Sequence, residues 1–230
     1  MRSFGSRDDT SVADEPLYAH YLATLPPSQQ AKHPAADGIL ASQPTDWREV
    51  VTQLLGPIPS GKPIWYQKHM AHHLTAGMDL RWVESTANAI LIRRPSEVIV
   101  SFAKVIPDPS PDELGFPQQL ALLDHLDRLG KPVVIIDSRT ILQAPEPALR
   151  ALCGALGIPF DECMLSWQPG PRATDGVWAP HWYANVEAST AFAPYVPRSE
   201  PVPTSLEPVL DVCQPMYDRL AERAITVPPQ

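Results

Sequence analysis

Short apolar or β-branched runs alternate with longer amphipathic segments along most of this chain. The short runs cover residues 10–14, 64–68, 89–93 and 133–137. The longer segments have apolar residues at helical spacing and cover residues 17–25, 46–55, 95–105, 116–129 and 147–156. Strands that alternate with helices predict an α/β fold, in which helices cover both faces of a parallel sheet.

The C-terminal part of the chain has a different pattern. Proline is abundant, with 28 residues, and it recurs over residues 194–204, where missing backbone donors predict an extended arm. Residues 205–220 return to helical spacing, although Pro215 is expected to kink that helix. We therefore expect an α/β domain over residues 1–193, a proline-rich arm over 194–204, and a C-terminal helix with a frayed end over 205–230 that belongs to the same domain.

Composition narrows the class of protein. The chain has 230 residues, 44% of them hydrophobic and 19% charged, which is typical of a globular protein. Its net charge of -8 argues against bulk binding of nucleic acid, because no overall basic field attracts phosphates. The three cysteines are scattered and lack metal-ligand spacing, which favours free thiols in a reducing compartment. With no apolar run of membrane-spanning length and no signal-peptide pattern, we expect a cytoplasmic protein that does not bind membranes.

One segment imitates a nucleotide-binding loop. Gly56-Pro-Ile-Pro-Ser-Gly-Lys62 has Walker A spacing up to its lysine, but Pro63 stands where a serine or threonine must meet magnesium. The segment also precedes a predicted strand, whereas a phosphate-binding loop follows one. We interpret it as a turn.

Polar residues end several of the predicted strands. Lys68, Arg93 and Asp137 stand at strand ends, and the carboxyl ends of parallel strands form the edge where ligands bind. A helix that begins at Pro95 would return the hydroxyl of Ser101 to this edge. Arginine offers a planar fork for phosphate oxygens and serine adds one donor, so this pair is a candidate phosphate site. The alternative is an ordinary strand that ends in a surface arginine.

Three histidines follow Lys68. In an extended chain, Lys68 and His69 would lie on opposite sides, whereas a helical turn would bring His69, His72 and His73 together. They are candidates for a general base, and the alternative is that they pack or cap this segment. A zinc site is the third possibility. Three ligands within five residues, with no carboxylate or cysteine beside them, lie too nearly along one helix to surround a metal, so we expect no metal.

Several segments, taken in order, resemble one bacterial branch of the sulfotransferase superfamily. These are residues 1–4, 12–18, 66–73, 93–101, 132–137, 152–159 and 175–183, so the resemblance covers nearly the whole chain. It implies a P-loop NTPase-like three-layer sandwich with a parallel sheet. It also implies transfer of a sulfuryl group from 3′-phosphoadenosine 5′-phosphosulfate (PAPS) to a hydroxyl or amine of a small-molecule acceptor.

The resemblance assigns roles to the strand-end residues. Arg93 and Ser101 match the ligands of the 3′-phosphate, and Lys68 matches the lysine near the bridging oxygen. The family's base position falls on Met70, which cannot act as a base, so His72 is the first substitute and His69 the second.

A later loop matches the region where the family places a second 3′-phosphate ligand and the adenine. Arg172 is the candidate phosphate ligand there, and Trp178 or Trp182 is the candidate to stack on a purine or to cover the acceptor. The alternative for Trp178 is core packing under the loop. The candidates on the acceptor side are Asp14, Glu15, His181 and Tyr183.

The family's 5′-phosphosulfate loop and the strand before it find no match in this chain. In this family that first strand lies in the middle of the sheet, so its absence would leave two half-sheets or force them to pair directly. Two explanations stand: a start upstream of Met1, which we favour, or a remnant that has lost donor binding. The chain is accordingly expected to be a sulfotransferase-like protein, with a non-catalytic nucleotide-binding or scaffold protein that keeps the 3′-phosphate half-site as the alternative.

Overall fold

The protein is described by a computed structural model that covers residues 1–197 and 200–228. Two compact units make up the chain, and each is described by itself. The first unit comprises Met1–Asp79 and Asp161–Phe192, and the second comprises Leu80–Phe160 and Ala193–Gln230. Residues 198–199 of the expected arm and residues 229–230 of the expected frayed end lie outside the described residues.

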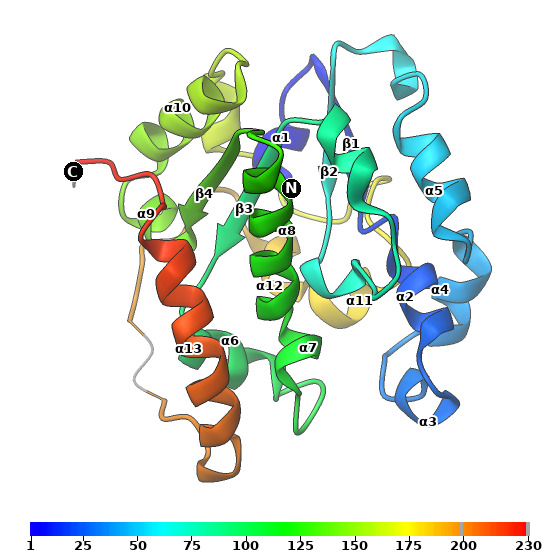
Figure 1. Cartoon of the computed structure of the whole chain (residues 1–230). Helices are drawn as coiled ribbons and strands as arrows, with labels where there is room; N and C mark the ends of the chain where they lie inside the picture. The colour runs from blue at the N-terminus through cyan, green and yellow to red at the C-terminus, as the bar shows by residue number, and fades with distance from the viewer. Residues whose placement is uncertain (198–199, 229–230) are drawn as a thin grey trace. The chain divides into compact units, whose positions relative to one another are not determined.

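The first unit combines one parallel strand pair with short helices (Figure 1). Its elements, with 3₁₀ helices labelled η, are α1 (Arg2–Gly5), β1 (Thr10–Asp14), α2 (Tyr18–Thr24), α3 (Pro27–Gln30), α4 (Ala36–Ser42), α5 (Trp47–Leu54), η1 (Pro59–Gly61), β2 (Ile64–Lys68), η2 (Ala71–His73), η4 (Glu162–Leu165), α11 (Ala179–Trp182) and α12 (Ala184–Ala188). The register pairs Thr10 with Ile64 and Asp14 with Lys68. Because the strands are parallel and in step, their last residues, a carboxylate and an amine, stand directly opposite each other.

An aromatic core holds the helices of the first unit together. Tyr18, Tyr21 and Leu22 of α2 pack with Ile39 of α4 and with a buried group from residues 178–183. Residues 17–25 were expected to form one helix from their apolar spacing, and α2 spans most of that segment. The segment that returns after residue 160 therefore completes the core that the N-terminal helices begin.

The second unit repeats the strand–helix alternation with longer helices. Its elements are η3 (Leu80–Ser85), β3 (Asn88–Ile92), α6 (Pro95–Phe102), α7 (Pro111–Leu114), α8 (Phe116–Arg128), β4 (Val133–Asp137), α9 (Ser138–Gln143), α10 (Pro145–Leu156), η5 (Thr204–Leu206) and α13 (Glu207–Ala221). Strands β3 and β4 are parallel, and Ile92 pairs with Asp137. Ile90, Ile92 and Ile135 of the strands form one core with α8 and α13, which contact each other (Figure 1).

The C-terminal segment is held more firmly than the expected frayed end. Helix α13 continues through Pro215, and Tyr217 and Leu220 on it are buried. After the helix, Ala224 forms a parallel bridge with Ile135 of β4, and the N–H of Ile225 donates to the carbonyl of Ile135 at 2.8 Å. This bridge extends β4 on one side and holds residues 224–225 against the strand.

The strands lie where the sequence predicted them, but they form two sheets of two strands each. This is the half-sheet arrangement, since the described strands of one pair make no ladder with those of the other. The fold is α/β with parallel strands, as predicted.

No helix in residues 1–197 and 200–228 is long and apolar enough to cross a membrane.

Burial along β3 alternates sharply between neighbouring residues, which gives a direct test of the core. Ile92 is fully buried, whereas the side chain of Leu91 is 55% exposed. Ile92→Ala should lower the free energy of unfolding by about 2–5 kcal/mol, because it removes buried methyl groups and leaves a cavity. Leu91→Ala, the matched control, should change it by about 0.5 kcal/mol or less. Urea unfolding followed by circular dichroism measures both, and equal losses would contradict this assignment of the core.

Candidate functional site

A cluster of buried charges lies where β1 and β2 end. Asp14 is the last residue of β1, Glu15 follows it, and Lys68 is the last residue of β2. Nζ of Lys68 forms an ion pair with Oε1 of Glu15 and lies 3.7 Å from Oδ1 of Asp14. The side chain of Lys68 is 25% exposed, whereas those of Asp14 and Glu15 are 1% and 8% exposed. Parallel pairing thus brings one partly accessible amine against two buried carboxylates.

Tyr183 completes this cluster from the returning segment. Its hydroxyl oxygen lies 2.8 Å and 2.9 Å from the two carboxylate oxygens of Asp14, and the amine of Lys68 donates to it at 3.1 Å. A phenol has one proton, so Tyr183 donates to a carboxylate and accepts from the lysine. Burial, with the charges of Glu15 and Asp14, raises the pKa of Tyr183. The hydroxyl therefore remains a donor at neutral pH.

Glu15 has an unusual backbone conformation. Its φ is 43°, in the left-handed region that non-glycine residues rarely adopt. The N–H of Glu15 donates to the carbonyl of Lys68 at 2.8 Å, which holds this turn in place at the end of the strand pair. Burial raises the pKa of Glu15 above its usual range, although Lys68 acts in the opposite direction. Backbone strain at a residue whose own carboxyl group has a raised pKa is typical of functional sites.

Trp178 lies in the core of the first unit. Its ring is 1% exposed and packs edge-on against Tyr18, with ring centroids 5.2 Å apart. A Cβ atom added to Gly176 would lie 2.2 Å from the Trp178 ring, so this close approach requires glycine. The N–H of that glycine donates to Oδ2 of Asp14 at 3.2 Å. The placement of Trp178 corresponds to the packing alternative, because a buried ring offers no face to a purine.

Of the three histidines after Lys68, His72 and His73 pack among aromatic rings of the first unit, whereas Nε2 of His69 lies 3.3 Å from Oε1 of Gln67. The chain turns into η2, and the rings of His72 and His73 lie 4.5 Å apart. His73 stacks on Tyr18 and on Tyr21, with centroid distances of 4.5 Å and 5.0 Å. Among the described residues, neither ring nitrogen of His73 has a hydrogen-bond partner.

Burial changes the acid–base character of these histidines. It lowers the pKa of His69 to about 4 and that of His72 to about 3. Both imidazoles are neutral at pH 7 and are weak bases there, since an efficient general base has a pKa near the working pH. Over residues 1–197 and 200–228, no group of three histidine, cysteine or acidic side chains is placed to hold a metal ion.

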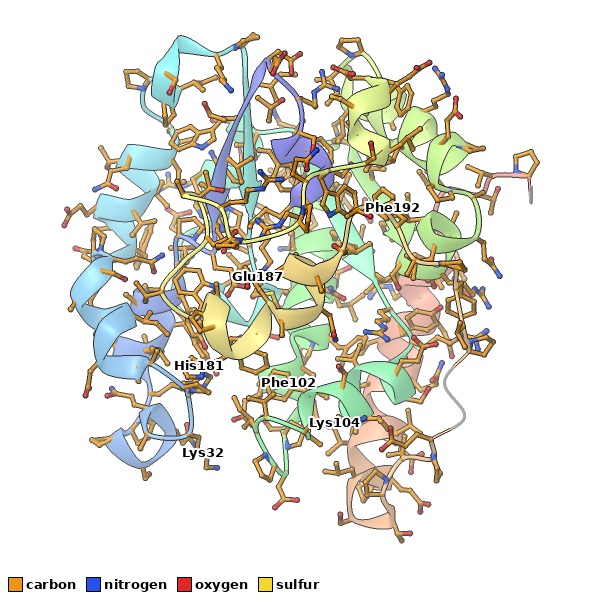
Figure 2. All side chains as sticks on the ribbon, turned by 180° about the vertical axis from the view of Figure 1, so that it is seen from behind. Lys32, Phe102, Lys104, His181, Glu187 and Phe192 are labelled. Carbon is orange, nitrogen blue, oxygen red and sulfur yellow. The ribbon has the colours of Figure 1, made fainter. Side chains whose placement is uncertain are left out.

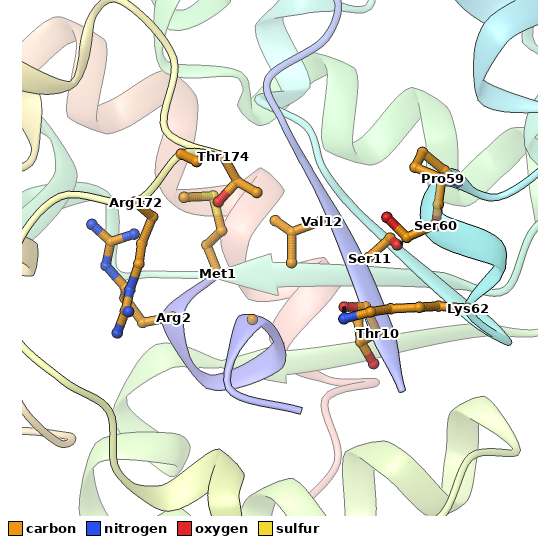
Figure 3. Close-up of a pocket in the computed structure, with 12 residues that line it drawn as sticks. Met1, Arg2, Thr10, Ser11, Val12, Pro59, Ser60, Lys62, Arg172 and Thr174 are labelled. Carbon is orange, nitrogen blue, oxygen red and sulfur yellow. Dashed lines mark hydrogen bonds between the residues drawn. The ribbon is translucent and has the colours of Figure 1, made fainter. Parts of the chain in front are cut away.

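A cavity of about 330 Å³ opens beside β1 in the first unit (Figure 3). Arg172 lines it together with Lys62 and with the hydroxyl-bearing residues Thr10, Ser11, Ser60 and Thr174. Lys62 donates to the carbonyl of Thr10 at 3.2 Å, and Arg172 to the carbonyl of Gln168 at 2.7 Å. The segment with Walker A spacing forms the 3₁₀ turn η1 before β2, so its interpretation as a turn is confirmed.

Arg2 also borders this cavity, but a buried carboxylate holds it. Its two terminal nitrogens donate to the two carboxylate oxygens of Asp175 at 2.6 Å and 2.8 Å, and both side chains are 4% exposed. Burial opposes ionisation of Asp175, but hydrogen bonds from Arg2 and from the N–H of Arg172 keep its pKa below the usual range. Arg2 is therefore a structural residue, and Lys62 and Arg172 are the cations that face the cavity.

In the second unit, Arg93 and Ser101 lie on one strand–helix element, as predicted. Arg93 directly follows β3, and Ser101 lies in the last turn of α6. Nε of Arg93 donates to Oε2 of Glu97 at 2.9 Å, and the arginine side chain is 36% exposed. Asp137 ends β4 at the same edge and also caps α9: it accepts from the N–H of Arg139 at 2.7 Å and from the hydroxyl of Tyr217 at 2.5 Å.

The structure divides the predicted site residues between the units. The first unit contains Lys68, His69, His72, Arg172 and Trp178, and the second contains Arg93 and Ser101. The cluster around Lys68 instead consists of residues that the sequence offered only as acceptor-side candidates, namely Asp14, Glu15 and Tyr183. The signal for Asp14 and Glu15 was an acidic pair at a strand end, whereas Tyr183 was indicated only by the resemblance. His181, the other such candidate, is exposed on α11 (Figure 2).

The buried imidazoles predict a pH dependence of stability. His69 and His72 stay neutral in the folded protein down to about pH 4 and pH 3, whereas unfolded histidines take up protons below about pH 6.5. The free energy of unfolding should therefore fall as the pH falls from about 6.5 to 4. Burial holds the pKa of His73 well below its usual range, so this ring gains a proton only on unfolding, and His73→Phe should make the fall shallower. Urea unfolding at several pH values measures the slope.

The exposed His181 provides the matched control for this test. His181→Gln should leave the slope unchanged, because that side chain is in water in both states. The same slope in His73→Phe as in the unchanged chain would contradict the assignment of His73 as a buried neutral group.

Comparison with known proteins identifies the family. A family model described as a sulfotransferase domain matches residues 1–224. Branched-chain-amino-acid aminotransferase-like proteins 2 and 1 of Arabidopsis thaliana are 34% and 36% identical to this chain over 220 residues, which is 96% of the chain. The chain spans only 38% and 39% of the length of these relatives.

Among solved structures, the sulfotransferase domain of the Synechococcus PCC 7002 olefin synthase matches 86% of this chain and 74% of its own length, with 16% identity and a TM-score of 0.43. The sulfotransferase domain from the curacin biosynthetic pathway matches 94% of this chain and 74% of its own, with 15% identity and a TM-score of 0.40. The family model, which spans nearly the whole sequence, is the finding that assigns the protein: the chain belongs to the sulfotransferase domain family.

Proposed function

We propose that this chain takes part in sulfuryl transfer from PAPS to a hydroxyl or amine of a small-molecule acceptor. The observation that carries the proposal is the cluster of Lys68 with two buried carboxylates and Tyr183, at the carboxyl ends of β1 and β2, in a chain of this family. The carboxyl ends of parallel strands are the usual position of ligands in α/β folds.

The proposed reaction needs a cation and a base. The acceptor oxygen or nitrogen attacks the sulfur, and the bond between the sulfur and the bridging oxygen of the phosphate breaks, so negative charge develops on that oxygen. Lys68, partly exposed and held by hydrogen bonds, is proposed to stabilise this charge. The acceptor loses one proton to a base, and adenosine 3′,5′-bisphosphate leaves.

Glu15 is the base that the geometry supports best. Its pKa is raised by burial, and it already contacts Lys68, so its proton affinity and its position both suit the transfer. His72 and His69, the bases proposed from the sequence, remain the rivals, although burial makes both weak bases.

Within the second unit, Arg93 and Ser101 are proposed as ligands of the donor's 3′-phosphate. Arg93 is half-buried and uses only Nε toward Glu97, and Ser101 lies on the helix that follows it. The terminal nitrogens of Arg93 can then bind two oxygens of the 3′-phosphate, with the hydroxyl of Ser101 as a further donor. Arg172 is proposed as a second anion ligand, since it lines an open cavity that Lys62 makes more basic.

Lys68→Ala tests the proposed chemistry most directly. It should lower kcat by roughly 100-fold or more, because a preorganised charge at a developing anion contributes on that scale. Transfer of radiolabelled sulfate from PAPS to a panel of phenols and amines provides the assay, with circular dichroism to confirm that each variant is folded. Lys131→Ala, at an exposed lysine of the second unit, is the matched control and should retain full activity.

Two results would contradict this proposal, the first its mechanism and the second its function. Transfer that persists in Lys68→Ala would remove the lysine from the mechanism. Binding of PAPS without transfer to any acceptor would favour the alternative, a non-catalytic nucleotide-binding or scaffold protein that retains the 3′-phosphate half-site.

A further inference from the structure

A buried carboxylate connects Arg93 to the proline-rich arm in the second unit. Glu97, in the first turn of α6, is 7% exposed. Its Oε2 accepts from Nε of Arg93 at 2.9 Å, and its Oε1 accepts from the hydroxyl of Tyr195 at 2.9 Å. The two oxygens thus have different partners, one in the strand–helix element and one in the arm.

This arrangement leaves the phosphate-binding edge of the arginine available. A guanidinium has five N–H donors, and Glu97 takes only the one on Nε. Within residues 1–197 and 200–228, Arg93 has no other hydrogen bond or ion pair. The four N–H groups on the terminal nitrogens, which form the usual fork for a phosphate, therefore remain unused.

Glu97 is ionised and cannot move freely. Burial opposes its ionisation, but the hydrogen bonds from Arg93 and Tyr195 keep its pKa below the usual range. The charges of Arg94 and Arg139 act on Tyr195, so positive side chains from the starts of α6 and α9 lie near this contact. If Tyr195 stopped donating, one oxygen of a buried carboxylate would lose its partner and Glu97 would gain rotational freedom.

A second contact, an ion pair, joins the arm to the segment that follows α6. Lys104, which follows α6 (Figure 2), pairs with Glu200 of the arm at 2.9 Å, but both side chains are more than half exposed. Exposed pairs of this kind contribute little. The contact of Tyr195 with Glu97 is therefore the stronger of the two links between the arm and α6.

We propose that Tyr195, acting through Glu97, is a positioning residue for the guanidinium of Arg93, so that the proline-rich arm sets the affinity of this chain for a nucleotide 3′-phosphate. The inference rests on the proposed function, in which Arg93 binds that phosphate.

Glu97 could instead act as a competitor of the phosphate, and the two roles predict opposite changes of affinity in Glu97→Gln. Glu97 is itself negative and repels a phosphate at Arg93, so a role as competitor would mean tighter binding in Glu97→Gln. Positioning requires the opposite, since the glutamine cannot accept equally strongly from both Arg93 and Tyr195.

Isothermal titration of the full chain with adenosine 3′,5′-bisphosphate and with adenosine 5′-phosphate tests the inference. Tyr195→Phe should weaken binding of the bisphosphate by roughly three- to tenfold, the size of one hydrogen bond, and leave binding of the monophosphate unchanged. Glu97→Gln should act in the same direction. A loss of stability alone would weaken both ligands equally, so the ratio of the two affinities isolates the 3′-phosphate.

Tyr217→Phe is the matched control. It too removes a tyrosine hydroxyl that donates to a buried carboxylate in the second unit, here Asp137. The ratio of affinities should stay as in the unchanged chain.

The outcomes separate the positioning role of Tyr195 from the proposed function, in which Arg93 binds the 3′-phosphate. An unchanged ratio in Tyr195→Phe, or tighter bisphosphate binding in Glu97→Gln, overturns the positioning role while a loss of affinity in Arg93→Ala leaves the proposed function standing. Binding of the bisphosphate that is unaffected by Arg93→Ala, or no binding by the unchanged chain, overturns both.

Discussion

The ion pair between Lys68 and the buried carboxylates is the interaction on which the first unit depends. A carboxylate that is 1% or 8% exposed has lost most of its water, and burying it is costly unless a cation and hydrogen-bond donors replace that water. Lys68 and Tyr183 supply these partners from distant parts of the chain. Arg2 and Asp175 repeat this arrangement with two side chains that are both 4% exposed. Buried charge therefore fixes how the segment Asp161–Phe192 joins the N-terminal part.

The same constraint links stability to the proposed chemistry. An amine that must stay beside two carboxylates is held in one place before any substrate arrives, which is the preorganisation that sulfuryl transfer requires. In the second unit, Glu97 fixes Arg93 in a comparable way, by one nitrogen and from a buried position. In both units, a charged residue proposed to meet substrate is oriented by a carboxylate that is itself hydrogen-bonded to a tyrosine.

Much of the fold followed from the sequence, because β-branched runs and helical spacing report burial directly. The strands were predicted to within one residue, and the short helices α3 and α4 were missed because they carry little apolar periodicity. The arrangement of the candidate site was harder to predict from the sequence. The pairing of Lys68 with Glu15 depends on strand register, and the burial of Trp178 depends on helices far away in the sequence. The contact of Tyr195 with Glu97 spans 98 positions and has no local pattern.

A thermal melt of this chain and of Arg93→Ala, with and without adenosine 3′,5′-bisphosphate, tests most directly whether Arg93 binds a nucleotide 3′-phosphate. A ligand at about 100 times its dissociation constant should stabilise the unchanged chain by about 2.7 kcal/mol, a shift of a few degrees. If Arg93 binds the 3′-phosphate, the shift occurs in the unchanged chain and is lost in Arg93→Ala. No shift in the unchanged chain, or an equal shift in both, would contradict the assignment of Arg93 as the 3′-phosphate ligand.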